Sequence, residues 1–143
     1  MNDRKTLEYQ WEYGTEDIAL EVNAYRYGNR LYIGMYSQDE GVWEPFSDLT
    51  VNLPGYPVKA NEAFIDDFCS ADKLEFIEKH RLGKRLPEVG YSGYCTYAKV
   101  AFDLERLAEF DKEGVERFRR LHGAKEQEPK EKNKGKSKAG AER

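Results

Sequence analysis

The chain has 143 residues, of which 35% are charged, 39% are hydrophobic and 13% are aromatic. This length suits a single domain, the aromatic content favours folding over disorder, and no run approaches the roughly 18 apolar residues of a membrane helix. The two cysteines, Cys69 and Cys95, form neither a disulfide framework nor a zinc motif, and no apolar stretch of a secretory signal follows the first residues. We therefore expect a cytoplasmic protein with no membrane contact.

Charge divides the chain into two parts. Residues 124–143 hold six lysines, one arginine and four glutamates, and so carry a net charge of +3. The other 123 residues hold 16 basic and 23 acidic side chains, which gives a net charge of −7. Residues 124–143 contain no Val, Ile, Leu, Met or aromatic residue, so they cannot bury enough apolar surface to offset the entropy of ordering. We predict one acidic domain over 1–123 and a disordered lysine-rich tail over 124–143.

The first part of the domain is typical of β-strands. Residues 7–13 place Tyr9, Trp11 and Tyr13 on one face of a predicted strand. Residues 18–36 alternate apolar and polar side chains on either side of residues 28–29, a Gly-Asn turn signal, and so predict a β-hairpin. The side chains expected to face the core from this hairpin are Ile18, Leu20, Val22, Leu31, Ile33 and Met35.

Shorter elements follow the hairpin. Residues 38–41 are typical of a polar loop, and residues 49–53 and 63–65 favour short strands. Residues 71–81 repeat apolar side chains at the three- and four-residue spacing of a helix. Ser70 is the predicted N-cap of this helix, and Gly83 is the predicted left-handed residue after its end.

The last third of the domain predicts loops, one strand and helix. Residues 84–90 and 91–94 are typical of loops, and residues 94–102 alternate as a strand does. Asp103 is placed to cap a helix, and residues 104–122 predict either two short helices or one bent helix, because Gly114 weakens helix continuity. Since short turns rather than repeated βαβ units join the strands, the sequence favours an α+β fold. We expect an antiparallel or mixed sheet with an N-terminal hairpin or meander, and two or three helices packed on one face.

Four segments together resemble a known family. They are residues 43–53 (WEPFSDLTVNL), 61–66 (NEAFID), 91–97 (YSGYCTY) and 102–104 (FDL), and they lie within a stretch, residues 43–111, that spans about half the chain. This pattern resembles the uncharacterised bacterial family called domain of unknown function 4313. The resemblance implies a small protein of gut-type Gram-positive bacteria, often carried on plasmids, phages or conjugative elements, and it implies no activity, cofactor or catalytic residue. Residues 84–90 are less basic than that pattern, which weakens any anion-binding role there.

Conventional catalytic and metal-binding patterns are weak. Cys95, His80 and His122 are the candidate nucleophile and bases, but a cysteine on a strand is more often structural, and the helix dipole accounts for His80. The two cysteines and two histidines lack the paired short spacing of a zinc site, and the acidic residues between 62 and 67 lack a calcium-loop pattern. We expect no enzyme, no cofactor and no metal, and we keep a small enzyme centred on Cys95 as a second alternative.

Tyrosine is the most unusual feature of the composition, with ten residues. Tyr and Arg are enriched in protein-binding hot spots, nucleic-acid bases can stack on aromatic rings, and tyrosines can also pack across strands with their hydroxyls in water. A domain of net charge −7 is poorly suited to a phosphate backbone, so among binding roles we favour a protein partner. The candidate binding residues are Tyr25, Tyr27, Arg30, Tyr32, Tyr36, Asp39, Glu40, Asp66, Asp67, Tyr91 and Tyr94.

These observations favour a non-enzymatic protein-interaction module of a mobile genetic element. One specific form of this hypothesis is an acidic inhibitor that occupies a basic channel of a host defence or nucleic-acid-processing complex. The alternative is a weak nucleic-acid-binding accessory protein that uses the lysine-rich tail and surface tyrosines.

Overall fold

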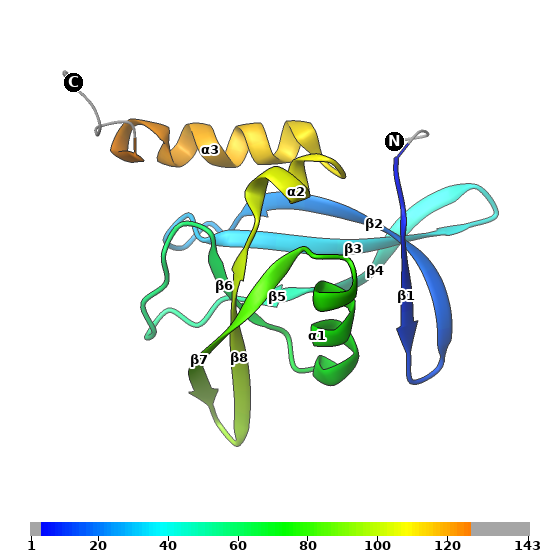
Figure 1. The fold of residues 1–143 in the computed structure, drawn as a ribbon, viewed down its shortest axis with the longest axis horizontal. Coiled ribbons are helices and arrows are strands. Elements are labelled where there is room, and N and C mark those ends of the chain that lie inside the picture. The colour runs from blue at the N-terminus through cyan, green and yellow to red at the C-terminus, as the bar shows by residue number, and fades with distance from the viewer. Residues whose placement is uncertain (1–3, 127–143) are drawn as a thin grey trace.

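The computed structural model describes residues 4–126, and its strands form two antiparallel sheets (Figure 1). The first sheet is a meander of β1 (Leu7–Trp11), β2 (Gly14–Ala24), β3 (Leu31–Asp39) and β4 (Val42–Asp48), paired in that order. The second sheet pairs β5 (Thr50–Val51), β6 (Glu62–Ile65), β8 (Cys95–Phe102) and β7 (Gly83–Ser92), in that order. The predicted α+β class, with antiparallel strands and an N-terminal hairpin, is confirmed.

The chain passes from the first sheet to the second at Leu49 and Thr50. The backbone N–H of Leu49 donates to the carbonyl of Ile33 in β3 at 2.9 Å, so Leu49 is still bound to the first sheet. Thr50 pairs with Ile65 in β6, while its buried hydroxyl oxygen accepts a hydrogen bond from the N–H of Ile33 at 3.1 Å. These two residues therefore join the sheets, whose strands run across one another in Figure 1.

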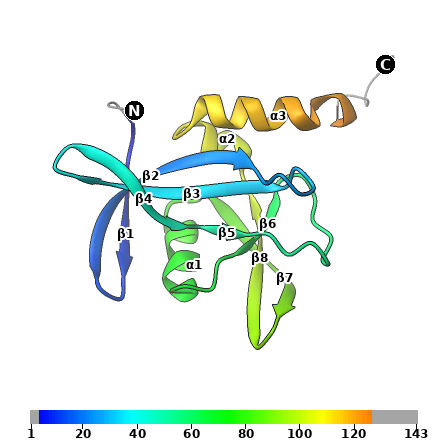
Figure 2. The same cartoon turned by 180° about the vertical axis from the view of Figure 1, so that it is seen from behind.

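Three helices complete the described fold. The first, α1 (Ser70–Lys79), packs against β1, β6 and β7, whereas α3 (Lys112–Glu126) runs along β2, and α2 (Leu104–Ala108) leads into α3 (Figure 2). Residues 104–122 contain two helices, one of the two predicted alternatives, but the break lies at residues 109–111 rather than at Gly114, and α3 is longer than predicted. Asp103 caps α2 as predicted by accepting two backbone N–H groups. The first three residues of the predicted tail are helical, because α3 continues to Glu126. Residues 127–143 lie outside the described part of the chain.

The core forms where the inner faces of the two sheets meet. All six side chains predicted to face inward from the 18–36 hairpin are at most 1% exposed, so the predicted register is confirmed. The second sheet, α1 and the two C-terminal helices add further buried apolar side chains to the same cluster, among them Ile65, Phe76, Ile77, Leu82, Val100, Phe102, Leu107, Val115 and Phe118.

Two segments predicted as loops are instead parts of hairpins. Over residues 38–41, β3 and β4 continue to a two-residue turn at Glu40 and Gly41, whose φ angles of 51° and 82° suit the twist of a tight hairpin. Residues 84–90 lie in β7, an edge strand whose register shifts between Arg85 and Val89. Pro87 lies in this irregularity, where its missing N–H costs no ladder hydrogen bond. The predicted loop at 38–41 is therefore correct for residues 40–41 only, and the loop predicted at 84–90 is wrong, because polar residues and proline also occur in edge strands.

The ends of α1 also differ from the prediction. Ser70 is the first helical residue, and Cys69, in a left-handed conformation, occupies the N-cap position without a side-chain cap. At the other end Arg81, with φ 59°, is the left-handed residue in place of Gly83, which begins β7. The next N–H donates to the carbonyl five residues back at 2.9 Å, which is the bond that typically closes a helix at a left-handed residue.

Residues 19–24 of β2 extend past Leu7, the first residue of β1, and side chains bind two backbone groups on this open edge. The Leu20 carbonyl accepts a hydrogen bond from Arg4, and the Val22 N–H donates to Asp111 Oδ2 at 2.8 Å. The other oxygen of Asp111 accepts the N–H of Gly114 at 3.1 Å and so caps the first turn of α3. A Cβ on Gly114 would lie 2.2 Å from Asp111 Oδ2 and 2.5 Å from the Val22 carbonyl oxygen. Glycine at this position therefore permits α3 to approach β2 closely, rather than interrupting the helix as predicted.

Replacing Gly114 by alanine should destabilise the fold, although alanine is the better helix former by about 1 kcal/mol. We expect Gly114→Ala to lower the free energy of unfolding by about 1–3 kcal/mol, because α3 must move away from β2. Urea unfolding measures this change. Gly55→Ala is the matched control, because its Cβ meets nothing within 4 Å, and it should be nearly neutral. Equal stability of the two variants would contradict the close approach.

Candidate functional site

Three of the four hairpin tyrosines proposed to bind a partner are half-buried, and their hydroxyls form hydrogen bonds within the molecule. The rings of Tyr25 and Tyr32 pack edge to face, with centroids 5.3 Å apart. The Tyr25 hydroxyl lies 3.0 Å from the threonine hydroxyl that joins the sheets, and the Tyr32 hydroxyl donates to Asp48 at 2.9 Å. Burial raises the pKa of Tyr25 to about 12 and also raises the pKa of Tyr32, whereas a hydrogen bond to Glu21 raises the pKa of Tyr36. These three rings stabilise the outer face of the first sheet.

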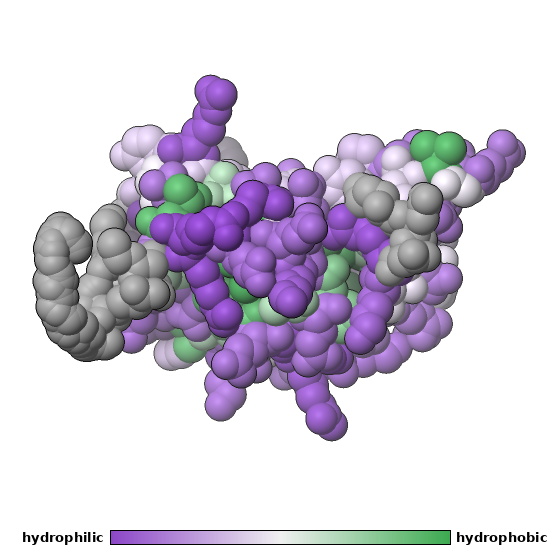
Figure 3. Space-filling model, turned by 90° about the horizontal axis from the view of Figure 1, so that it is seen from above, coloured by the Kyte–Doolittle hydropathy of each residue, from purple (hydrophilic) through white to green (hydrophobic). Residues whose placement is uncertain are grey.

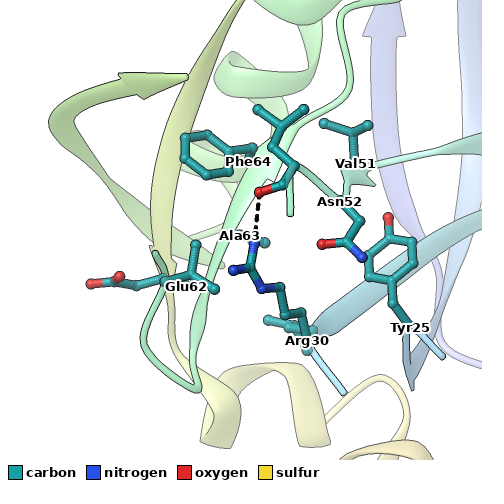
Figure 4. A pocket seen from close by; sticks show the side chains of 10 residues that line it. Tyr25, Arg30, Val51, Asn52, Glu62, Ala63 and Phe64 are labelled. Atoms are coloured by element: carbon teal, nitrogen blue, oxygen red, sulfur yellow. Dashed lines mark hydrogen bonds between the residues drawn. The ribbon is translucent and has the colours of Figure 1, made fainter. Parts of the chain in front are cut away.

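Arg30 forms a hydrogen bond to the backbone of the segment that follows β5. Its guanidinium donates to the Leu53 carbonyl at 2.8 Å, the dashed line in Figure 4. Together with Tyr25, Asn52 and Phe64, Arg30 lines a cavity of about 10 Å³ between the two sheets. A cavity of this size holds about one water molecule, so it is too small for a substrate.

Three other candidate residues lie at hairpin tips. Tyr27, which is 66% exposed, is in the loop between β2 and β3, and Asp39 and Glu40 are exposed at the turn between β3 and β4. These two tips lie at opposite ends of the first sheet (Figure 1), so the structure does not bring Tyr27 together with the two acidic residues.

Asp66 is a structural ion-pair partner. Lys73 of α1 is completely buried, and its Nζ lies 3.0 Å from Asp66 Oδ2, 2.8 Å from Ser47 Oγ and 2.7 Å from the Asp48 carbonyl oxygen. All three ammonium protons therefore have an acceptor, which a buried charge requires. This ammonium ties the end of β4 and the segment after β6 to α1. Sequence reasoning missed it, because lysine is rarely fully buried.

Asp67 connects the start of α1 to the tip of the β7–β8 hairpin. Its Oδ2 accepts a hydrogen bond from the Cys95 thiol at 3.2 Å, and this bond raises the pKa of Cys95. A nucleophilic cysteine needs a lowered pKa and a neighbouring base. The two candidate bases bind backbone carbonyls on other elements: His80 lies 2.7 Å from the Glu8 oxygen and His122 lies 2.8 Å from the Asn29 oxygen. This arrangement does not activate a thiolate.

Exposed aromatic side chains gather at one end of the molecule. Four of the seven exposed large apolar side chains among the described residues are Tyr13 (71%), Phe68 (53%), Tyr91 (59%) and Tyr94 (107%). Tyr13 is in the β1–β2 turn, Phe68 lies just before α1, and the other two are at the β7–β8 tip. Figures 1 and 2 both place these three segments at the lower end of the molecule, with the β1–β2 turn and the β7–β8 tip on either side of α1, and we call this end the aromatic end. Of the predicted binding residues, Tyr91, Tyr94 and Asp67 lie there.

A half-buried indole supports part of this end. The ring of Trp11 lies 5.1 Å from Tyr13, 5.1 Å from Phe46 and 6.2 Å from Phe68, centroid to centroid, and it stacks on the buried Tyr9. The prediction of Tyr9, Trp11 and Tyr13 on one face of a single strand holds for the first two residues only. Since β1 ends at Trp11, Tyr13 stands at the hairpin tip instead. The sequence signal that could have placed it there is the adjacent glycine at position 14.

Three carboxylates border the aromatic end. Glu12 and Asp67 are exposed next to Tyr13 and Phe68 in the sequence, and Asp72 Oδ2 accepts the N–H of Glu12 at 3.0 Å. None of the ion pairs formed within residues 4–126 includes these carboxylates. Figure 3 looks at the opposite end, over α3, where the surface is mostly hydrophilic. The aromatic end therefore combines exposed rings with uncompensated negative charge.

The described residues offer neither a metal-binding cluster nor a membrane-spanning helix. No group of three or more His, Cys, Asp or Glu side chains in this part of the chain is arranged to hold a metal ion. No helix within the described range is both long enough and apolar enough to cross a bilayer.

Removing the buried ammonium should destabilise the protein strongly. We expect Lys73→Met to lower the free energy of unfolding by about 3 kcal/mol, because Asp66 and two further oxygens lose their buried cation. Lys79→Met is the matched control on the same helix. Its Nζ lies 3.4 Å from Glu8, both side chains are about half exposed, and the expected loss is below about 1 kcal/mol. Urea unfolding of both variants measures the difference, and similar losses would contradict a structural role specific to Lys73.

The raised tyrosine pKa values predict a fall in stability at alkaline pH. An unfolded tyrosine titrates near pH 10, whereas the pKa of Tyr25 in the fold is about 12. Above about pH 10 the unfolded chain therefore releases a proton that the folded chain retains, and the free energy of unfolding decreases with pH. Tyr25→Phe should make this decrease less steep, as measured by urea unfolding between about pH 9 and 12. Tyr27→Phe, which removes an exposed hydroxyl, is the control and should keep the original slope; an unchanged slope in Tyr25→Phe would contradict the assignment.

Comparison with known proteins identifies a family but no relative of known function. The chain matches no curated protein and no solved structure. Residues 19–121 match the family described as "Domain of unknown function (DUF4313)". This range contains the whole second sheet and the β7–β8 tip, but it leaves out β1 and Tyr13. Because the match covers more than half of its residues, the chain belongs to the DUF4313 family.

Proposed function

We propose that this protein is a non-enzymatic interaction module that binds another protein through the aromatic end. The observation that carries the proposal is that three separate segments, each with exposed aromatic side chains, lie at the same end of the molecule. Isolated exposed apolar residues are ordinary, but a gathered group marks an interaction surface.

The chemistry of the β7–β8 tip supports this proposal. Residues 91–94 read Tyr-Ser-Gly-Tyr, a composition that antibody loops also use, because tyrosine offers a large contact area with few rotatable bonds. Gly93 has φ 60° and makes the tight turn that exposes Tyr94. A paired hairpin holds the tip, so little side-chain and backbone freedom is lost when a partner binds.

The acidic inhibitor of a host defence or nucleic-acid-processing complex is the specific form of this proposal. In that form the partner is a protein with a basic nucleic-acid channel, and the acidic residues near the aromatic end supply the complementary charge. The mobile-element setting of this form comes from the family resemblance alone. Nucleic-acid binding is the competing proposal. The exposed side of α3 carries four basic side chains, Lys112, Arg117, Arg119 and Arg120, beside Glu113 and Glu116. The net charge of −7 over residues 1–123 nevertheless disfavours contact with a phosphate backbone.

A photo-cross-linker at single positions tests the proposal. The full chain is expressed in its native host with p-benzoylphenylalanine in place of Tyr13, Tyr94 or Tyr27. Tyr27 is the matched control, because it is exposed to the same degree as Tyr13 but lies in the β2–β3 loop, away from the aromatic end.

We expect irradiation to join one discrete protein to the chain from positions 13 and 94 but not from position 27. The adduct should resist nuclease and be identified by mass spectrometry. Equal labelling from all three positions would contradict a specific surface. An adduct removed by nuclease would support the nucleic-acid proposal instead.

A further inference from the structure

We infer that the partner presents a basic segment to the aromatic end, with arginine or lysine side chains stacked on the exposed rings between the bordering carboxylates. This inference rests on the proposed function and names the chemistry of its partner. It concerns a protein segment, because the same surface repels the phosphates of a nucleic acid.

The exposed charges next to Tyr13 and Phe68 are carboxylates, since the nearby ammonium of Lys73 is buried and paired with Asp66. Glu12 precedes Tyr13, Asp67 precedes Phe68, and Asp72 lies in the first turn of α1 with its carboxylate against the β1–β2 turn. Within the described residues these carboxylates form no ion pair, whereas the adjacent Asp66 is neutralised by Lys73. An approaching cation therefore meets several uncompensated charges at short range, which raises the association rate and selects the sign of the partner.

The rings themselves favour a cation over a neutral side chain. The face of a tyrosine or phenylalanine ring carries negative potential, and a guanidinium stacks on it while its N–H groups remain free to bind carboxylates. Tyr94 and Tyr91 form no ring contact with another aromatic residue in the described part of the chain, so their faces are open. A basic segment can therefore satisfy both the rings and the carboxylates.

The chain already contains one such combination of ring, cation and carboxylate. The ammonium of Lys73 lies 5.6 Å from the ring centroid of Phe68 and 3.0 Å from Asp66. Phe68 thus contacts one intramolecular cation and remains half exposed on its outer side, next to the carboxylate of Asp67. The external contact that we infer repeats the same arrangement of ring, cation and carboxylate at the surface.

A random peptide library displayed on phage tests the inference without knowledge of the partner. The full 143-residue chain is immobilised and panned at low salt, and a recovered peptide is then synthesised and titrated by fluorescence anisotropy. We expect recovered peptides to be enriched in Arg and Lys relative to the library. Their affinity should fall as salt rises, because the Debye length shortens from about 30 Å at 0.01 M to about 8 Å at 0.15 M.

Two matched triple variants test whether the carboxylates at the aromatic end attract the peptide. The first variant lacks three negative charges at the aromatic end, because it combines Glu12→Gln, Asp67→Asn and Asp72→Asn. The second variant is the control and lacks three negative charges on other exposed parts of the chain, because it combines Glu40→Gln, Glu44→Gln and Glu113→Gln. We expect the first variant to bind the peptide roughly tenfold more weakly and with a smaller salt dependence, and the second to bind nearly as the original chain does. Thermal unfolding of both variants confirms that each is folded, and the salt dependence of the original chain tests the inference independently of them.

The possible results distinguish failure of the inference alone from failure of the proposed function. A further variant, Tyr13→Ser combined with Tyr94→Ser, removes two exposed rings. If the recovered peptides are neutral or acidic but bind this double variant more weakly than the original chain, the inference is overturned and the proposed function stands. Basic peptides that bind both triple variants equally would also overturn the inference. Failure to enrich any peptide, or peptides that bind Tyr13→Ser/Tyr94→Ser unchanged, would overturn both.

Discussion

The buried ammonium of Lys73 holds together the parts of the fold on which the surface chemistry depends. It hydrogen-bonds to the end of β4 and to the segment between β6 and α1, and so fixes the segment that carries Asp67 and Phe68. Removing a charge of this kind from water costs several kcal/mol, and only well-placed acceptors offset that cost. An apolar side chain would fill the same space without this cost, but it would not hold a polar loop in place. The ion pair therefore positions the loop, and removing only Lys73 destabilises the fold because Asp66 is then left without its counter-ion.

The sequence predicts the regular parts of this fold well. Strict alternation over residues 18–36 determines which side chains enter the core, because a register slip of one residue would expose all six. Asp103 is recognisable as a cap from its place between a strand and an apolar helical repeat. Predictions based on single residues fared less well: Ser70 and Gly83 carry the usual signals for helix ends, yet Cys69 and Arg81 take those positions. Tertiary contacts of α1 outweigh these local preferences.

The candidate binding residues were harder to predict, because tyrosine suits both packing and binding. Tyr32 and Tyr36 lie in β3, Tyr25 directly follows β2, and all three hydroxyls find hydrogen-bond partners within the molecule. Tyr91 and Tyr94 instead flank a turn and are exposed. Proximity to a turn glycine distinguishes the two groups, and the same signal applies to Tyr13 beside Gly14. Phe68 carries no such signal. Its exposure follows from the path of the chain between β6 and α1, which is a property of the fold and not of the local sequence.

The covered edge of β2 has a consequence for behaviour at high concentration. An open strand edge is a template on which another chain can form hydrogen bonds, and it promotes fibrous aggregation. Here the Leu20 carbonyl and the Val22 N–H are both occupied by side chains, and α3 lies against the same strand. At the outer edges of the two sheets, β4 carries Pro45 and β7 carries Pro87, each of which interrupts a continuous ladder. Contacts between copies through these edges are thereby disfavoured, and crowded copies of the chain can remain separate molecules.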